Sequence, residues 1–408
     1  MPIQKKFFVK LKEKGIKHII IYTIPWQLND KMNKVISIIA RKIFVHFPIQ
    51  NVIIIESHND FDSNGGAFYD YLIENGYNKN YKIIWFLRNK CPESLPENVE
   101  GYSYNRLSLK REYYYCVAKY IICGHFLLPV LREGQKSYYT THGAFGLKAF
   151  KKNIAIPSGI SYILSPSEDL LPLLANEYSI EYPNTKQIIL GYPSHDVFYT
   201  NEAGDLHKIT ENKYKKVILW MPTFRKSVIG RRDSSSDNPL GIPIIASLQN
   251  YQQLNKKLQE QNTLLIIKIH PMQDMSTVKI SSLSNILVLD GKSVKKLNID
   301  NYKLMKDVDA LISDYSSAAY DYLHLNRPIA YTMDDAETYN LGFIVDDPKK
   351  FMAGDILYNF EDFYNFVLKI IAEEDNYKIQ RRELSKKIWK YHDGNSSKRL
   401  ARHMGLKK

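Results

Sequence analysis

From residue 51 onward, short runs of β-branched and aromatic residues alternate with longer stretches in which apolar positions recur at helical spacing. Strands that alternate with helices build parallel sheets from βαβ units. The runs fall into two series, which predict an α/β chain with two Rossmann-like domains. The predicted strands are Val52–Ile55, Lys82–Leu87, Tyr120–Cys123, Ser137–Thr141, Tyr162–Ser165 and Gln187–Leu190 in the first series, and Lys216–Met221, Leu264–Ile269, Ile286–Leu289, Ala310–Ile312 and Ile329–Tyr331 in the second.

The break between the two series falls in the polar stretch 200–213. We therefore predict an N-terminal Rossmann-like domain over residues 51–205 and a C-terminal Rossmann-like domain over 206–375. Residues 376–408 are predicted as a basic, helical C-terminal tail, and residues 1–50 as a basic amphipathic segment at a membrane surface.

The apolar residues of the first segment are interrupted by Lys31, Lys34, Arg41 and Lys42. Two interpretations stay open at this point. The segment is either a helix packed on the domain, with lysine stems lying along apolar surface, or an amphipathic helix in a membrane interface. Its apolar positions are Val35, Ile36, Ile38, Ile39, Ile43, Phe44 and Phe47.

The distribution of charge favours a membrane surface over nucleic acid. The 408 residues carry a net charge of +13, and the basic excess lies at the two ends, whereas the middle is slightly acidic. A nucleic-acid binder more often carries its basic stripe on the folded domain, whereas basic ends with interspersed apolar residues suit anionic lipid. We therefore expect no nucleic-acid partner.

Targeting signals and cysteines also bear on location. Residues 1–17 lack the apolar core of a signal peptide, and no run of about 18 apolar residues occurs that could span a bilayer. The three cysteines form no CxxC pair, which indicates a reducing compartment and no zinc site. We expect a peripheral protein at the cytoplasmic face of the cell membrane.

Open parallel sheets bind ligands beyond the carboxyl ends of their strands, so polar residues at those positions are candidates. The segment Ser313-Asp314-Tyr315-Ser316-Ser317 follows a predicted strand and precedes a helix, with Asp321 one turn further on. Ser316 and Ser317 beside free N–H groups suit a phosphate. A plain helix cap is the alternative.

Two histidines stand at strand ends. His270 follows Lys268 and Ile269 and is held by Pro271, where it can donate to a phosphate oxygen or move a proton. His142 lies in the segment Thr140-Thr141-His142-Gly143-Ala144-Phe145, and is the first choice for general base. Gly143 and Gly146 allow a ligand to approach the backbone closely.

Weaker candidates complete the set. Thr223, Phe224 and Arg225 follow another strand, and Arg225 can pair with two phosphate oxygens, although an exposed surface arginine is the alternative. The turn Gly191–Asp196 could touch a base or ribose, or be a turn only. No GxGxxG motif, P-loop or complete metal-ligand set is found, so we expect no cofactor and no metal. His125, His324 and His392 are interpreted as structural or surface residues.

Taken in order, these motifs resemble the CDP-glycerol glycerophosphotransferase family of bacterial teichoic-acid and capsule synthesis. The resemblance covers about residues 51–402. Further segments that carry it are Ile54-Ile55-Glu56-Ser57, Gly191-Tyr192-Pro193, Arg327-Pro328, Tyr339 with Gly342-Phe343, and Asp393 to Arg399.

The resemblance implies a GT-B fold, in which two Rossmann-like domains face a central cleft. It also implies that residues 51–205 form the acceptor domain and that residues 206–375 form the donor-nucleotide domain, which holds most of the donor. His142 and His270 are the implied catalytic residues. The implied donor and phosphate contacts are Thr141, Gly143, Ala144, Phe145, Thr223, Phe224, Arg225, Lys268, Ile269, Ser316, Ser317 and Asp321. Ala144-Phe145 stand where Thr-Pro is common, and Ser194 where an arginine is common, which leaves the transferred alcohol open.

The resulting hypothesis is transfer of glycerol phosphate, or a related polyol phosphate, from a CDP-linked donor to a hydroxyl of a lipid-linked or polymeric glycan, with release of CMP. Such transfer needs in-line positioning and neutralised charge more than covalent help. Two alternatives remain. One is a glycosyltransferase of the same fold that uses a nucleotide sugar, and the other is a non-catalytic basic protein that binds membrane or nucleic acid.

Overall fold

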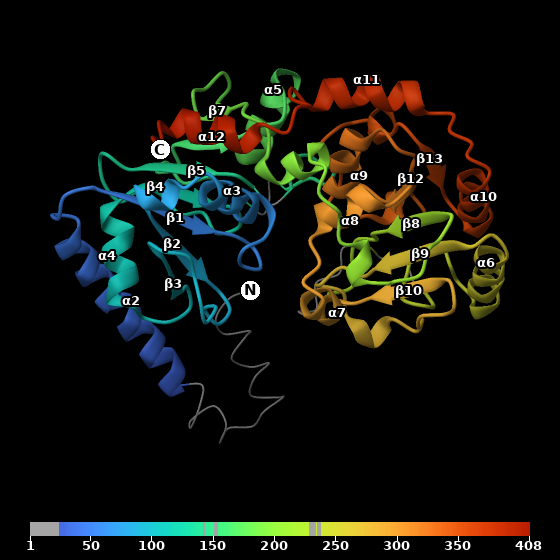
Figure 1. Cartoon of the computed structure of the whole chain (residues 1–408), viewed down its shortest axis with the longest axis horizontal. Helices are drawn as coiled ribbons and strands as arrows, with labels where there is room; N and C mark the ends of the chain where they lie inside the picture. The colour runs from blue at the N-terminus through green and yellow to red at the C-terminus, as the bar shows by residue number, and fades with distance from the viewer. Residues whose placement is uncertain (1–23, 142, 151–153, 228–233, 235–237) are drawn as a thin grey trace.

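The computed structural model describes residues 24–141, 143–150, 154–227, 234 and 238–408, with side chains from residue 31 on. Two parallel sheets form the centres of two lobes, drawn on the left and right of Figure 1. This arrangement matches the two series of strands predicted from the sequence.

The first sheet has seven strands in the order β3-β2-β1-β4-β5-β6-β7. All its pairings are parallel. Its middle strands are rich in β-branched residues and buried on both faces, as parallel strands covered by helices require. The strands are β1 (Gln50–Glu56), β2 (Lys82–Leu87), β3 (Val99–Ser103), β4 (Ala118–Cys123), β5 (Lys136–Tyr139), β6 (Tyr162–Leu164) and β7 (Gln187–Ile188).

The second sheet has six parallel strands in the order β10-β9-β8-β11-β12-β13. Every predicted strand is present in one of the two sheets, and the structure adds the edge strands β3 and β13. The strands are β8 (Lys216–Trp220), β9 (Thr263–Lys268), β10 (Ile286–Leu289), β11 (Ala310–Ser313), β12 (Ile329–Thr332) and β13 (Asp355–Leu357).

Side-chain caps explain where several helices begin. Ser108, Ser247, Asp290, Asp300 and Asn359 each accept a hydrogen bond from a backbone N–H of the first turn. The α-helices are α2 (Ile24–Phe44), α3 (Ser63–Glu74), α4 (Leu109–Val117), α5 (Leu171–Tyr178), α6 (Leu248–Glu260), α7 (Gly291–Lys296), α8 (Asn301–Asp307), α9 (Ser317–Asp321), α10 (Phe360–Ile371), α11 (Lys378–Ile388) and α12 (Ser396–Met404).

The closing helices connect the two lobes. Helix α11 lies along the second lobe, and α12 returns to the first (Figure 1). There Leu400, Ala401 and Met404 join the core formed with Ile53 and Phe68. The C-terminal segment is therefore packed against both lobes and contributes to holding them together.

Helix α2 packs on α4 at the outer side of the first lobe (Figure 1). Arg41 of α2 forms an ion pair of 2.5 Å with the buried carboxylate of Glu112 in α4. The opposite side of α2 is exposed and apolar. Within the part of the chain described above, no helix is both long enough and apolar enough to cross a bilayer.

Candidate active site

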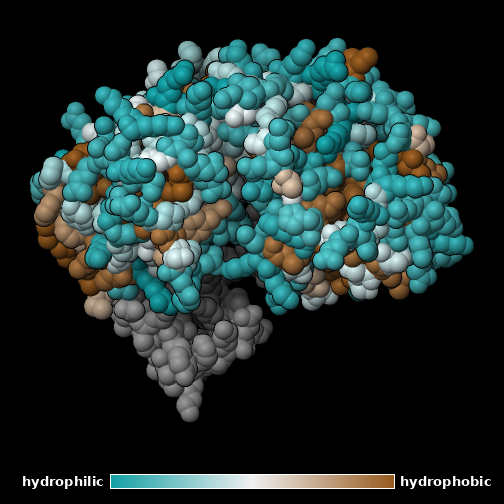
Figure 2. All heavy atoms as spheres, in the orientation of Figure 1, coloured by the Kyte–Doolittle hydropathy of each residue, from teal (hydrophilic) through white to brown (hydrophobic). Residues whose placement is uncertain are grey.

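The segment after β5 meets the segment after β11, so the two lobes touch through predicted site residues. A Cβ atom added at Gly143 would lie 2.6 Å from Oγ of Ser317, and one at Gly146 would lie 2.9 Å from the Ser317 backbone nitrogen. The backbone N–H of Leu147 donates to the carbonyl of Tyr315 at 3.0 Å. This close approach explains the glycines, because a side chain at either position would force the segments apart. Figure 2 shows the surface hollowed between the lobes.

Thr141 directly precedes this contact and has a left-handed backbone, with φ of 56°. Its carbonyl, and that of Thr140, accept hydrogen bonds from the Asn64 side chain. Asn64 Oδ1 in turn accepts from the backbone and hydroxyl of Ser194. Asn64 was not singled out from the sequence, although its place at the start of a helix after β1 was a usable signal. His142, the predicted general base, lies outside the described residues.

Arg225 is buried between two carboxylates instead of standing open to the cleft. Its Nη1 lies 3.2 Å from Oδ2 of Asp314, and its Nε lies 2.5 Å from Oδ2 of Asp335. Thr223 donates to the same Asp314 oxygen through its backbone N–H (2.9 Å) and its hydroxyl (2.6 Å). The structure thus places Thr223 and Arg225 in a network that fixes the segment after β11.

Asp314 remains ionised in this network. Burial alone would raise its pKa, but Lys148, Arg225 and the hydrogen bonds from Thr223 outweigh burial and lower it. The other Asp314 oxygen accepts from the backbone N–H of Ser316 at 3.0 Å. Ser316 and Ser317 are half-buried and follow this carboxylate at the start of α9.

His270 and Lys268 lie at the carboxyl end of β9. Burial, reinforced by Lys148 and Lys268, lowers the pKa of His270 to about 3, so the ring is neutral at physiological pH. Its Nδ1 accepts a hydrogen bond from the Met272 backbone N–H at 3.0 Å. The single ring proton therefore resides on Nε2, which makes His270 a neutral hydrogen-bond donor.

The Lys268 side chain is almost fully buried. Burial lowers its pKa to about 8, against the opposing effect of Asp300. Phe224 packs near His270, with ring centroids 5.0 Å apart. Lys148, whose charge acts on both His270 and Asp314, was missed in the sequence because it follows no strand.

Besides Thr141, Thr223, Arg225 and Lys268, four further predicted contact residues are buried. Ile269 and Ala144 are core residues, and Phe145 packs edge-to-face on Tyr320 with centroids 4.9 Å apart. Asp321 forms a buried pair with His195, whose Nε2 lies 2.9 Å from its Oδ1. His195 Nδ1 is in turn 3.0 Å from Nε2 of His324. Asp321 and the turn 191–196 therefore meet at the contact between the lobes.

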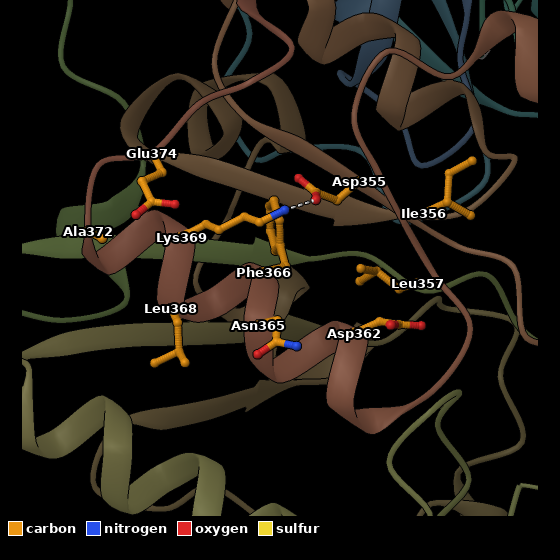
Figure 3. Close-up of a pocket in the computed structure, with 10 residues that line it drawn as sticks. All are labelled: Asp355, Ile356, Leu357, Asp362, Asn365, Phe366, Leu368, Lys369, Ala372 and Glu374. Atoms are coloured by element: carbon orange, nitrogen blue, oxygen red, sulfur yellow. Dashed lines mark hydrogen bonds and ion pairs between the residues drawn. The ribbon is translucent and has the colours of Figure 1, made fainter.

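A surface pocket of about 480 Å³ lies elsewhere, between edge strand β13 and helix α10 (Figure 3). In it Lys369 is paired with Asp355. None of the predicted site residues lines this pocket, so it is separate from the candidate active site.

The sequence matches the family described as CDP-Glycerol:Poly(glycerophosphate) glycerophosphotransferase over residues 39–405. The chain belongs to this family. The resemblance drawn from the motifs is thereby confirmed, and with it the assignment to a family of transferases.

Relatives with assigned roles lie at low identity. The chain is 26% identical to a teichoic acid poly(glycerol phosphate) polymerase of Bacillus spizizenii, over 85% of this chain and 89% of that protein. It is 24% identical to the teichoic acid glycerol-phosphate primase of Bacillus subtilis, over 83% of this chain and 88% of the primase. It spans about half (48%) of a B. subtilis polymerase.

Solved structures confirm the fold. The wall teichoic acid polymerase TagF superposes with a TM-score of 0.71 at 19% identity, covering 97% of each chain. The two α/β domains with parallel sheets therefore have the GT-B-like arrangement expected from the sequence. The N-terminal part of the predicted amphipathic segment, residues 1–23, lies outside the described residues.

Proposed function

We propose that this protein transfers glycerol phosphate, or a related polyol phosphate, from a CDP-linked donor to a hydroxyl of a glycan acceptor, and releases CMP. Family membership across residues 39–405 carries this proposal. It is supported by the contact between Gly143 and Ser317, which joins predicted site segments from both lobes.

In the proposed reaction the acceptor hydroxyl attacks the β-phosphorus of the donor, and the bond to the CMP oxygen breaks. His142 takes the hydroxyl proton. His270 donates from Nε2 to a phosphate oxygen, and Lys268 supplies positive charge while it is protonated. Ser316 and Ser317 donate to the diphosphate from the start of α9. Donors fixed in advance are effective because they need no rearrangement as charge develops.

Arg225 has a supporting role in this proposal. Because Asp314 and Asp335 both engage it, it positions Asp314 and through it the N–H of Ser316. A substitution such as Arg225→Lys would keep the charge but lose the planar fork that spans two carboxylates.

We further infer that the acceptor is lipid-linked and that helix α2 holds the protein at an anionic membrane surface. The exposed face of α2 carries large apolar residues, among them Val35, Ile38, Ile39 and Ile43, each more than half exposed. Exposed Lys31, Lys34 and Lys42 accompany them. This face forms part of the brown patch along the lower left edge in Figure 2. Apolar residues with flanking lysines suit the boundary between headgroups and acyl chains.

The donor is tested by incubating the protein with CDP-glycerol, CDP-ribitol and a panel of nucleotide sugars, with a glycan acceptor present. We expect CMP from a CDP-polyol and no nucleoside diphosphate from any nucleotide sugar. His270→Ala should lower CMP release roughly 100-fold, with an unchanged melting temperature as evidence of folding. Turnover of a nucleotide sugar alone would instead identify a glycosyltransferase.

A further inference from the structure

The order of strands reverses at one place in each sheet. In the second sheet the reversal lies between β8 and β11, whose carboxyl ends lead to Thr223 and Asp314 of the candidate active site. In the first sheet it lies between β1 and β4. Open parallel sheets bind ligands in the crevice at such a reversal. The residues proposed above to bind the donor do not include those that directly follow β1 and β4.

Two histidines lie at this crevice. His58 follows β1 and His125 follows β4, and their rings are stacked with centroids 4.5 Å apart and planes 6° from parallel. Arg88, which follows β2, places its guanidinium carbon 4.1 Å from the ring centroid of Phe126. Phe126 stacks on Tyr104 in turn, at 4.2 Å. These five side chains, referred to below as the group, are His58, Arg88, Tyr104, His125 and Phe126. All are only partly buried, so the group can contact a ligand.

The buried side chain of Glu56 holds the segments that carry His125, Phe126 and Arg88. Oε2 of Glu56 accepts hydrogen bonds from the backbone N–H groups of Gly124, His125 and Phe126, at 2.9 to 3.2 Å. Oε1 of Glu56 lies 3.8 Å from Nη2 of Arg88. The Arg88 backbone N–H donates to Asp60 at 2.9 Å. The segments after three strands are thus joined, and the rings are held before any ligand binds.

The group borders the same cleft as His270. Asn89, next to Arg88, accepts a hydrogen bond of 2.8 Å from Nζ of Lys295, which belongs to α7 of the other lobe. Helix α7 begins at Gly291, where an added Cβ would lie 3.5 Å from Pro271, the residue that follows His270. The crevice of the first lobe therefore opens opposite the proposed donor site.

The surrounding charges favour a hydroxyl over a phosphate. Burial and the charge of Arg88 lower the pKa of His58, while Asp62 opposes them, so this ring is neutral at physiological pH. A neutral imidazole both donates and accepts, and Arg88 donates, which together match the two roles of a hydroxyl. Asp60 accepts from the Arg88 backbone and Asp62 acts on His58, so two carboxyl side chains beside these residues disfavour a phosphate. Both faces of Phe126 are covered by Arg88 and Tyr104, so the apolar surface for the C–H groups of a polyol or sugar comes from the partly exposed Tyr104 ring.

We propose that His58, His125 and Arg88 form the acceptor subsite, which binds the hydroxyl-bearing polyol or sugar end of the acceptor, with His58 in contact with a hydroxyl. This inference rests on the proposed function, because it identifies the part of the acceptor that the first lobe binds in that reaction. It adds His58 and His125 to the residues that touch substrate.

The test uses the full chain, with a short poly(glycerol phosphate) oligomer that ends in free hydroxyls as the acceptor. His58→Gln and Arg88→Gln should each raise the KM for the oligomer about tenfold or more, the loss expected for one or two hydrogen bonds. Affinity for CDP-glycerol, measured by calorimetry, should stay within about twofold of the wild type. His403→Gln is the matched control, because His403 contacts Tyr138 outside this crevice.

A second probe separates hydroxyl from phosphate recognition. The same oligomer with phosphorylated ends should bind the wild type at least about tenfold more weakly, and equal or tighter binding would overturn the assignment. An unchanged KM in both variants, or a parallel fall in donor affinity, would also overturn it. If no CDP-polyol yields CMP, the proposed function fails, but binding of the hydroxyl-ended oligomer that depends on His58 would still support the subsite.

Discussion

At the residue scale, the candidate site relies on burial to set the charge of its groups. His270 is kept neutral by burial next to Lys148 and Lys268, so it acts as a donor with a fixed proton and not as a switch near neutral pH. Lys268 is different, because burial lowers its pKa only to about 8. It is therefore the group whose charge changes within the range in which the protein can be assayed.

Lys268 gives a pH prediction with a definite sign. Affinity for CDP-glycerol should fall as pH rises through about 8, because the ammonium that attracts the diphosphate is lost. The Lys268→Met variant should bind more weakly and lack this step. Calorimetric titrations from about pH 6.5 to about 9.5 measure it. A wild-type affinity that is flat over this range would contradict the assignment of Lys268 to the donor.

The free energy of unfolding should change with pH in the direction opposite to the affinity for CDP-glycerol. The pKa of Lys268 in the folded state lies below its unfolded value of about 10.4, so the unfolded chain binds more protons between the two values. The contribution of Lys268 to the free energy of unfolding therefore rises with pH over this interval and is lost as pH falls through about 8. Lys268→Met should reduce this slope in urea unfolding.

At the element scale, the segment between β5 and residue 147 must approach the start of α9 closely. Gly146 is the tightest point against backbone atoms, with Ser317 N at 2.9 Å and Tyr315 O at 3.3 Å from an added Cβ. Backbone atoms cannot rotate away as a side chain can, so a methyl group here would displace Ser317 itself.

Gly146→Ala should lower transfer activity by roughly 10- to 100-fold, since displacement of a site by about 1 Å has effects of this size. The steady-state rate of CMP formation is the measurement. Gly291→Ala is the matched control, because an added Cβ there is at ordinary contact distance, 3.5 Å from Pro271. Equal activity of both variants would mean that Gly146 does not position Ser317.

At the scale of the whole molecule, the C-terminal helices and the His195–Asp321 pair hold the lobes together, and α2 presents an apolar face outward. Trp389 and Lys390 illustrate the first point. The indole N–H of Trp389 donates to the carbonyl of Tyr320 in the second lobe at 3.0 Å, and the backbone N–H of Lys390 donates to the carbonyl of Pro166 in the first lobe at 3.0 Å. The exposed face of α2 lies on the first lobe, the lobe that we propose binds the acceptor. This arrangement places the acceptor subsite on the same lobe as the proposed membrane contact.

The α2 face is tested by the double variant Ile38→Glu, Ile39→Glu in flotation with vesicles that contain anionic lipid. Vesicle binding should fall at least about tenfold, because two apolar contacts are lost and two repelling charges are added. Turnover of a soluble acceptor should not change. Ile379→Glu, on the exposed side of α11, is the control. Vesicle binding equal to that of the wild type would leave α2 without the proposed role.

The sequence alone predicted the two sheets, which the structure confirms, and it supplied the candidate site residues, whose roles stay predictions. Strands buried on both faces read as continuous apolar runs, so every inner strand was predicted. The edge strands β3 and β13 were missed because Val-Glu-Gly-Tyr-Ser and Asp-Ile-Leu lack such a run. Polar residues at strand ends, such as His270 and Ser316, were found because parallel strands direct their carboxyl ends to one edge.

Only the tertiary structure decided what each of those residues touches. Arg225 and Asp321 looked equally available in the sequence, yet packing pairs the first with Asp314 and Asp335 and the second with His195. The stacking of His58 on His125 joins segments 67 residues apart in the chain. Local sequence sets which elements form, but burial and charge pairing depend on contacts between distant segments, and only the folded chain brings these together.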